Sequence, residues 1–375
     1  MWTCKKYYDD NIQKFTKERM DGQDIVYAPI LIGDRYEIIG ILSDSGGFGI
    51  IYNSIDKRLN DRKVLIKARK YNNVLGLFSH KNDLSREEQI QDIREDVEFE
   101  IEALKYFKRR GEARLPSLND VIEDFSPSLY GPHIDEQGKE FYYENSDVYD
   151  SEPYIVMQMI EGENLGDYVD KGIDYIMKDR GYTSINQWEF AVMQYALELT
   201  SILKHIHECK PTKYGKYKEE FFIYQDLKPH NIIITNDTFI TLLDFGGVLL
   251  VRRDKNGNTK SNFKGTGTPG VGTYGYMAPE VKKGSYELSR LDERVDIYSF
   301  GATLFHLLTA KSLNKSISNE NERIPIEELI KMNYTLETCN LVKKCIEENK
   351  EDRFVNMNSI KCEIFEVLKA IKKGK

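Results

Sequence analysis

Cysteine and long apolar runs are scarce in this sequence. Its 375 residues contain five cysteines, an odd number with no C-x-x-C pair, which argues against a disulfide framework and against a zinc site. No apolar run approaches the roughly 18 residues that a membrane helix needs, and the opening MWTCKKYYDD lacks the charged-then-apolar layout of a signal peptide. We therefore expect a cytoplasmic protein with reduced thiols and no membrane partner.

Proline and net positive charge are also low. The 10 prolines and 40% hydrophobic residues exclude a disordered or low-complexity chain, so we expect a folded protein with a sizeable core. The formal net charge of -8, from 61 acidic and 53 basic residues, gives no general attraction for nucleic acid, and we expect none as a partner. The length allows two or three domains, or one large two-lobed one.

The first part of the chain is rich in strand patterns and has one strong helix signal. Residues 36–70 alternate apolar and polar positions around a glycine cluster, which indicates antiparallel strands. Ser85 and Glu88 form a capping box before an amphipathic helix that runs through Arg110. The apolar stripe of this helix includes Ile90, Ile93, Val97, Ile101 and Leu104.

The second part of the chain is mostly helical. From about residue 186 to the end the pattern indicates helices, apart from the strand-rich segment 221–250, and the change of pattern falls near residues 157–162. The sequence therefore predicts an α+β fold, with a β-rich half that has one main helix and a larger α-helical half after it.

Two short motifs carry the chemistry. YQDLKPHN occupies residues 224–231 and DFG occupies residues 244–246, and the β-branched stretches between them predict a hairpin. If its turn centres on Asp237, position 231 faces position 243, so Asn231 and Asp244 become neighbours at the end of the ladder.

These neighbours suit a metal ion. Mg²⁺ prefers oxygen ligands and usually keeps substrate phosphates among them, and Asn231 and Asp244 offer two such oxygens. Asp226 and Lys228, a few residues away, could hold a hydroxyl nucleophile and offset phosphate charge. Phosphoryl transfer needs these parts.

With Ala-Pro-Glu at residues 278–280, the strings D-L-K-P-x-N and D-F-G resemble those of the protein kinase superfamily, over roughly residues 36–370. Five fixed letters arise by chance at a given position about once in a million. The resemblance implies a two-lobed protein kinase fold and a serine/threonine protein kinase with ATP and Mg²⁺ as cofactors and proteins as substrates. The implied kinase would be of the non-RD type, because Gln225 stands where an arginine usually precedes the catalytic aspartate.

The resemblance also assigns roles to the residues of both motifs. Asp226 would be the catalytic base and Lys228 its phosphate-side partner, while Asn231 and Asp244 would hold Mg²⁺. Three supporting contacts are implied as well: Thr273 with Asp226, Asp296 with the catalytic loop, and Arg353 with Glu280.

Lys67, at the end of Val-Leu-Ile-Lys, resembles the lysine that contacts the nucleotide phosphates, although the same pattern suits a surface lysine in a basic strand. Its expected partner is Glu100. The helical stripe supports this pairing independently, because Glu100 lies on the same face as Val97 and Leu104, and a carboxylate on an apolar face needs a cation.

The glycine cluster at residues 45–51 resembles the glycine-rich loop of kinases, whose backbone amides approach phosphates, although a glycine cluster alone is most often a turn. Asp44 stands where the first glycine is expected, and Leu65 stands where a small residue usually covers the adenine, so both predict weak ATP binding.

Met157 resembles a gatekeeper, and a plain buried strand end suits it equally well. The expected nucleotide-contact residues are Gly46, Gly47, Gly49, Ile51, Leu65, Lys67, Met157, Gln158, Met159 and Ile233.

The expected activation segment spans residues 244–280. Because the neutral amide of Gln225 cannot pair with phosphate, phosphorylating a hydroxyl there is not expected to order the segment, and its glycines make ordering costly. Control would then come from a partner, from the N-terminal extension or from abundance. The candidate hydroxyls are Thr259, Ser261, Thr266 and Thr268.

The expected divisions are an N-terminal extension packed on or near the small lobe (1–35), a small lobe (36–158) and a large lobe (159–375). The small lobe carries an acidic insert at 130–152, and the large lobe carries a basic insert at 210–218. Each insert suits a solvated loop or, alternatively, a docking site for a regulatory partner. Opposite charge could hold the two inserts together.

The resulting hypothesis is a Mg²⁺-dependent kinase that transfers the γ-phosphoryl group of ATP to Ser or Thr of proteins. The alternative is a pseudokinase, a scaffold or nucleotide-binding module with little or no transfer activity, which Asp44, Leu65 and Gln225 suggest. A related enzyme acting on a small molecule is disfavoured by the Ala-Pro-Glu segment.

Overall fold

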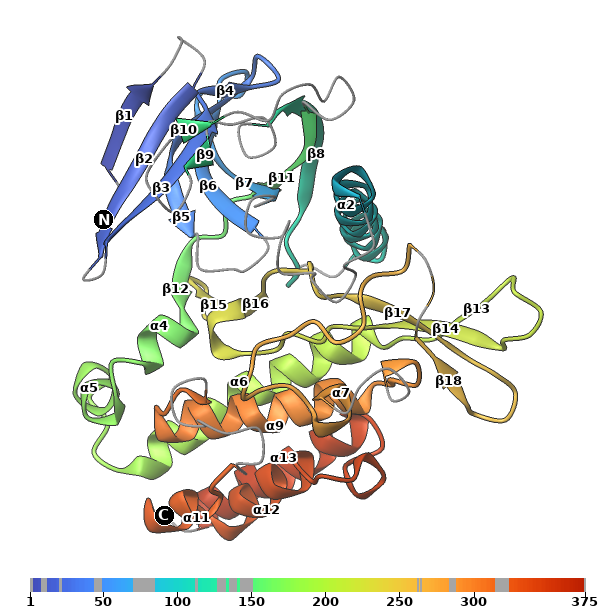
Figure 1. Ribbon diagram of the computed structural model, residues 1–375. Helices are drawn as coiled ribbons and strands as arrows, with labels where there is room; N and C mark the ends of the chain where they lie inside the picture. The colour runs from blue at the N-terminus through green and yellow to red at the C-terminus, as the bar shows by residue number, and fades with distance from the viewer. Residues whose placement is uncertain are drawn as a thin grey trace. The chain divides into compact units, whose positions relative to one another are not determined.

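The chain divides into two compact units. In the computed structural model the described residues are 3–7, 12–19, 22–43, 49–69, 85–111, 114–126, 133–134, 140–141, 151–261, 263, 265–282, 288–313 and 324–373. The first unit comprises residues 1–105 and 116–159, and the second comprises residues 106–115 and 160–375. The first is β-rich with one long helix and the second is mainly helical (Figure 1), which confirms the α+β class.

A six-stranded antiparallel sheet forms the centre of the first unit, in the order β4-β5-β6-β7-β11-β8. Its strands are β4 (Leu31–Ile32), β5 (Tyr36–Ser43), β6 (Gly49–Asp56), β7 (Arg62–Arg69), β8 (Leu118–Phe125) and β11 (Ser151–Gln158), and a separate pair joins β9 (His133–Ile134) to β10 (Glu140–Phe141). Because side chains alternate along a strand, β7 presents Ile66 and Ala68 to one face and Lys67 and Arg69 to the other.

A second, three-stranded sheet covers one face of the first. It consists of β1 (Thr3–Tyr7), β2 (Ile12–Arg19) and β3 (Gly22–Pro29). Phe15 from β2 shares a buried apolar cluster with Tyr36, Tyr52 and Tyr154 of the central sheet. The side chain of Gln13 donates hydrogen bonds to the backbone oxygens of Pro29 and Ile38, at 3.1 and 2.9 Å, so polar groups as well as apolar packing join the two sheets.

Helix α2 (Arg86–Arg109) begins at the predicted capping box. The Ser85 backbone N–H donates to Glu88 Oε2 at 2.8 Å, and the Glu88 N–H donates to Ser85 Oγ at 3.2 Å. The predicted stripe is buried on its inner face: Ile90, Ile93, Val97, Ile101 and Leu104. The helix is therefore confirmed, and it ends one residue before the predicted Arg110.

Glu152 corrects the interpretation of the acidic insert. Most of 130–152 lies outside the described residues, but Glu152 is in β11 and only 2% exposed, so a solvated loop is wrong for this residue. Strand alternation places it on the buried face with Tyr154. It accepts hydrogen bonds from Ser126 Oγ (2.6 Å) and the Arg69 backbone N–H (3.2 Å), while burial raises the pKa of its carboxyl group to about 7.

Helices form the core of the second unit. They are α4 (Leu165–Val169), α5 (Ile173–Asp179), α6 (Ile185–Ile206), α7 (Pro279–Lys282), α9 (Arg294–Thr309), α11 (Glu327–Lys331), α12 (Leu336–Cys345) and α13 (Met357–Lys373), with the 3-10 turns η2 (Pro229–Asn231) and η3 (Lys350–Asp352). Helix α6 packs on α13, and α9 packs on α12. Helix α9 is buried on all sides after Arg294, as expected for an apolar central helix. No helix in the described part of the chain combines the length and apolarity needed to cross a bilayer.

Two small sheets of the second unit carry the motifs. One joins β12 (Gly162–Asn164), β15 (Ile232–Thr235) and β16 (Ile240–Leu242). The other joins β13 (Lys210–Pro211), β14 (Glu219–Ile223), β17 (Leu249–Arg253) and β18 (Thr259–Lys260) in chain order (Figure 1). The expected activation segment therefore supplies two strands, β17 and β18, to a sheet.

The basic insert at 210–218 leads into β14. Its lysines are largely exposed, while the guanidinium of Arg252 lies over the rings of Tyr214 (3.9 Å) and Phe263 (4.2 Å). The insert thus packs on the activation segment through an aromatic contact. The contact expected between this insert and the acidic one falls largely outside the described residues.

Candidate functional site

The hairpin between the two motifs has the predicted register. Ile232 faces Leu242, Ile234 faces Ile240, and the Leu243 N–H donates to the backbone oxygen of Asn231 at 2.7 Å. The prediction of a turn centred on Asp237 is therefore confirmed. This register places Asn231 and Asp244 at the same end of the β15–β16 ladder.

Three polar side chains hold the carboxylate of Asp226. Its Oδ1 accepts from Thr273 Oγ1 at 2.6 Å, and its Oδ2 accepts from Lys228 Nζ at 2.9 Å and from Asn231 Nδ2 at 3.1 Å. Lys228 Nζ also donates to Thr273 Oγ1 at 2.6 Å. The implied contact of Thr273 is confirmed, and charge-assisted hydrogen bonds hold both oxygens of the carboxylate in place.

Asp296 fixes the backbone just before Asp226. It is fully buried in α9 and accepts from the backbone N–H groups of Tyr224 (2.7 Å) and Gln225 (2.8 Å) and pairs with His207 Nε2 (2.7 Å). Three partners satisfy a charge that would be costly to bury alone. The anchoring contact implied by the resemblance is confirmed.

Asn231 and Asp244 form an oxygen donor set that suits Mg²⁺. Asn231 Nδ2 donates to the backbone oxygen of Asp226 at 2.8 Å, which turns the amide oxygen away from that loop. Asp244 has a positive φ of 53° and accepts the Gly246 N–H on Oδ1 at 3.1 Å. One amide oxygen and one carboxylate match the ligands Mg²⁺ takes from proteins beside phosphates and water.

Phe245 holds Asp244 from the buried side. Its ring is 1% exposed and lies edge-on to Tyr224, with centroids 5.5 Å apart, and 5.6 Å from the ring of Phe107. Glu280, at the far end of the expected activation segment, accepts two 2.8 Å hydrogen bonds from the guanidinium of Arg353. This implied pair is also confirmed, and it fixes the far end of the segment.

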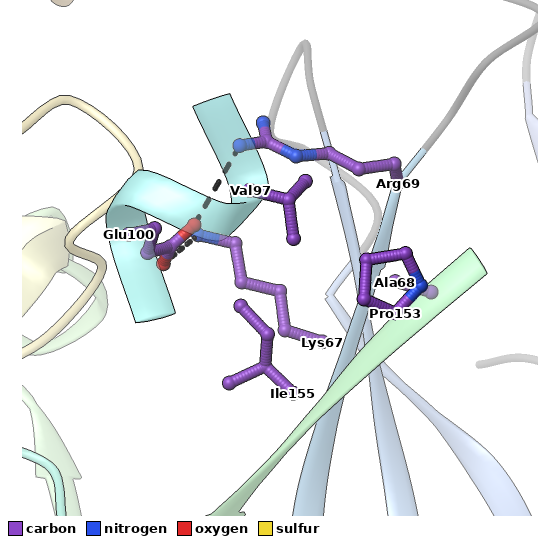
Figure 2. Close-up of a pocket in the computed structure, with 7 residues that line it drawn as sticks. All are labelled: Lys67, Ala68, Arg69, Val97, Glu100, Pro153 and Ile155. Atoms are coloured by element: carbon purple, nitrogen blue, oxygen red, sulfur yellow. Dashed lines mark hydrogen bonds and ion pairs between the residues drawn. The ribbon is translucent and has the colours of Figure 1, made fainter. Parts of the chain in front are cut away.

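In the first unit, Lys67 meets Glu100. Figure 2 shows Lys67 extending from β7 toward Glu100 on α2, with Nζ 2.6 Å from Oε1. Lys67 is 7% and Glu100 2% exposed, so the surface-lysine alternative is wrong. The predicted pairing of these two residues is confirmed, and each buried charge has its partner.

Arg69 is a member of this cluster that sequence reasoning missed. Its Nη2 lies 3.6 Å from Glu100 Oε2, and the side chain is buried (Figure 2). Glu100 is thus shared by two cations, one on each oxygen. Strand alternation was the available signal, because Arg69 stands two residues after Lys67 and must point to the same face.

Most of the remaining predicted nucleotide-contact residues lie on strands, and the roles of all of them stay predictions. Gly49 and Ile51 are in β6, Leu65 is in β7, Met157 and Gln158 end β11 with Met159 after them, and Ile233 is in β15 of the second unit. Ile51 faces Lys67, and Leu65 faces Met157. Gly46, Gly47 and Asp44 lie outside the described residues.

Comparison with known proteins gives a consistent family. A family model described as "Protein kinase domain" matches residues 118–365. The chain is 25% identical over 350 residues to a probable serine/threonine-protein kinase of Clostridium acetobutylicum, covering 90% of this chain and 40% of that one. It is 30% identical over 222 residues to the serine/threonine-protein kinase cds1 of Schizosaccharomyces pombe, covering 54% and 39%. The chain thus spans about 40% of the length of these curated relatives.

Proposed function

Because this chain belongs to the protein kinase family, we propose that it transfers the γ-phosphoryl group of ATP to serine or threonine hydroxyls of protein substrates. The observation that carries this proposal is the arrangement at Asp226, whose two carboxylate oxygens are held by Thr273, Lys228 and Asn231. The relatives named serine/threonine-protein kinase support it.

Asp226 is the group that would accept the proton of the substrate hydroxyl. Its orientation is fixed on both oxygens before a substrate arrives, and preorganisation of this kind lowers the barrier to proton transfer. Lys228 lies 2.9 Å from Asp226 and would offset negative charge as the phosphoryl group moves. Thr273 bridges the two side chains, which fixes the position of the base relative to the cation.

Asn231 and Asp244 would hold Mg²⁺, and Lys67 would contact the nucleotide phosphates while Glu100 fixes its ammonium group. When bound, Mg²⁺ and ATP supply the transferable phosphoryl group and offset its charge. The lysine is already held in an extended position by a buried carboxylate, so little side-chain entropy remains to be lost on binding.

The test is phosphate transfer from labelled ATP, with Mg²⁺, to a generic protein substrate. We expect labelled serine and threonine with the wild type, a loss of label of roughly a hundredfold or more with Asp226→Asn, and no label with Asp244→Ala. Asp237→Asn is the matched control, because Asp237 is an exposed carboxylate in the turn of the same hairpin. Transfer by Asp226→Asn within about tenfold of the wild type overturns its role as base, and a wild type that binds ATP without transferring phosphate supports the pseudokinase alternative.

A further inference from the structure

The side chain of Gln225, the residue before Asp226, makes three hydrogen bonds. Its side chain is buried, with the residue 3% exposed. Nε2 donates to the backbone oxygens of Gly247 (2.6 Å) and Thr268 (3.1 Å), and Oε1 accepts from the Gly270 N–H (3.0 Å). Both amide protons and the amide oxygen are used, and every partner is backbone of the segment 244–280.

These three contacts join two distant parts of that segment. Gly247 follows the Asp-Phe-Gly motif directly, whereas Thr268 and Gly270 lie shortly before Thr273. A single carboxamide therefore links the start of the segment to its second half. Each of the two parts is held to the residue adjacent to Asp226.

The backbone of Gln225 is itself fixed in an uncommon conformation. Its φ is 68°, and the Asp226 N–H donates to the Tyr224 oxygen at 3.0 Å, which makes a γ-turn of the rare, strained kind. The bond from its N–H to Asp296 holds this turn in place. Strain of this kind persists only where surrounding contacts determine the conformation, and here they orient the amide toward the segment.

The segment also packs closely on the backbone of Gln225. A Cβ added to Gly272 would lie 3.1 Å from the Gln225 backbone oxygen, closer than most side chains tolerate. The next residue is Thr273, whose hydroxyl reaches Asp226 Oδ1 at 2.6 Å. The contacts of Gln225 thus lead directly to the residue that bridges Asp226 and Lys228.

Only a carboxamide can make this set of bonds. A guanidinium has no acceptor for the Gly270 N–H, and a carboxylate has no donor for the carbonyls of Gly247 and Thr268. The hydroxyls of the segment support the same interpretation. Ser261 and Thr266 are buried and already donate to the backbone oxygens of Leu288 and Phe263, so neither hydroxyl is open to a kinase in this conformation.

We propose that Gln225 is a positioning residue that orders the activation segment through its carboxamide, so that Thr273 stays on Asp226 without phosphorylation. This inference rests on the proposed function, in that it assigns Gln225 a part in the same reaction. It deepens that function by naming what replaces a phosphate in holding the segment.

The experiment compares wild type with Gln225→Met, which keeps the length and removes all three hydrogen bonds. Gln194→Met, at an exposed position of α6, is the matched control. Hydrogen exchange measured on peptides covering residues 247–273 should speed up in Gln225→Met and stay unchanged in the control. Turnover of an external peptide should fall by about tenfold or more with ATP affinity unchanged, and phosphatase treatment of the wild type should leave its turnover unchanged.

A second variant, Gln225→Glu, covers the case in which Gln225→Met does not fold. It keeps the acceptor for the Gly270 N–H but turns an oxygen toward the carbonyls of Gly247 and Thr268. Amide hydrogen exchange should therefore speed up in the peptides that contain these two residues. Wild-type exchange in either folded variant, or faster exchange with full turnover, would overturn the proposal, as would loss of wild-type activity on dephosphorylation. A wild type that transfers no phosphate contradicts the proposed function instead, and the exchange measurement still decides whether Gln225 orders the segment.

Discussion

Glu152 places an ionisable carboxyl group on the buried face of β11. The hydroxyl of Ser126 and the N–H of Arg69 favour its charged form, but desolvation outweighs them and raises the pKa to about 7 from an ordinary value of 4.5. Between pH 4.5 and about pH 7, the folded protein therefore keeps a proton on Glu152 that the unfolded chain has already released.

It follows that this site makes the free energy of unfolding decrease as pH rises from about 4.5 to about 7, by at most about 1.4 kcal/mol per pH unit. Glu152→Gln should remove that decline, so wild type and variant should diverge in urea unfolding between pH 5.5 and pH 8, with the wild type losing more. Glu98→Gln, exposed on α2, is the control. Equal pH dependence in wild type and Glu152→Gln would contradict the assignment.

Arg69 contributes a second cation to the carboxylate of Glu100. We expect Arg69→Met to lower the free energy of unfolding by about 1–3 kcal/mol, because it removes a charged partner from a buried carboxylate while Lys67 remains. Arg62→Met, at the exposed start of the same strand, should change it by less than about 0.5 kcal/mol. Chemical unfolding of both variants measures the difference, and equal, small effects would show that Arg69 adds nothing to the pair.

At the scale of elements, the sequence pattern predicts a helix or hairpin correctly where all the residues that determine it lie within that element. Helix α2 was predicted with its capping box, and Glu100 with its need for a cation, since a carboxylate on an apolar helical face is visible in the sequence. The hairpin register from Asn231 to Leu243 followed from the turn position alone.

What could not be predicted depends on pairing between distant segments. The burial of Glu152 requires β11 to lie between β7 and β8, which no local pattern specifies. The same holds for β17, which pairs with β14 some 30 residues earlier. The activation segment seemed costly to order because of its glycines, yet Gly257, Gly265, Gly267 and Gly270 all take positive φ, a conformation in which glycine is the favoured residue.

Ser261, which follows β18, fixes this part of the chain to residues 288–291 of the same unit. Its Oγ donates to the Leu288 oxygen at 2.6 Å and accepts from the Leu291 N–H at 3.1 Å. Ser261→Ala should therefore lower the free energy of unfolding by about 1–3 kcal/mol, because it leaves two buried backbone groups without this partner. Thr259→Val, which removes an exposed hydrogen bond to Arg290, should cost less, and thermal unfolding of both variants compares them. An equal cost for the two variants would show that burial of Ser261 does not matter.

For the whole molecule, the proposed machinery is divided between the two units. Lys67 and Glu100 belong to the first, while Asp226, Asn231 and Asp244 belong to the second. Substitution of Asp226 can separate nucleotide binding from proton transfer, because Asp226 is assigned to the proton and to no part of the nucleotide.

The central claim is that Asp226 acts as the base of a phosphoryl transfer. The most direct test measures, for wild type and Asp226→Asn, both the Kd for Mg²⁺-ATP by calorimetry and the turnover on a protein substrate. We predict a Kd unchanged within about twofold, and a turnover that falls by roughly a hundredfold to ten-thousandfold, the usual contribution of a positioned general base. A variant whose turnover stays within about tenfold of the wild type would contradict the account.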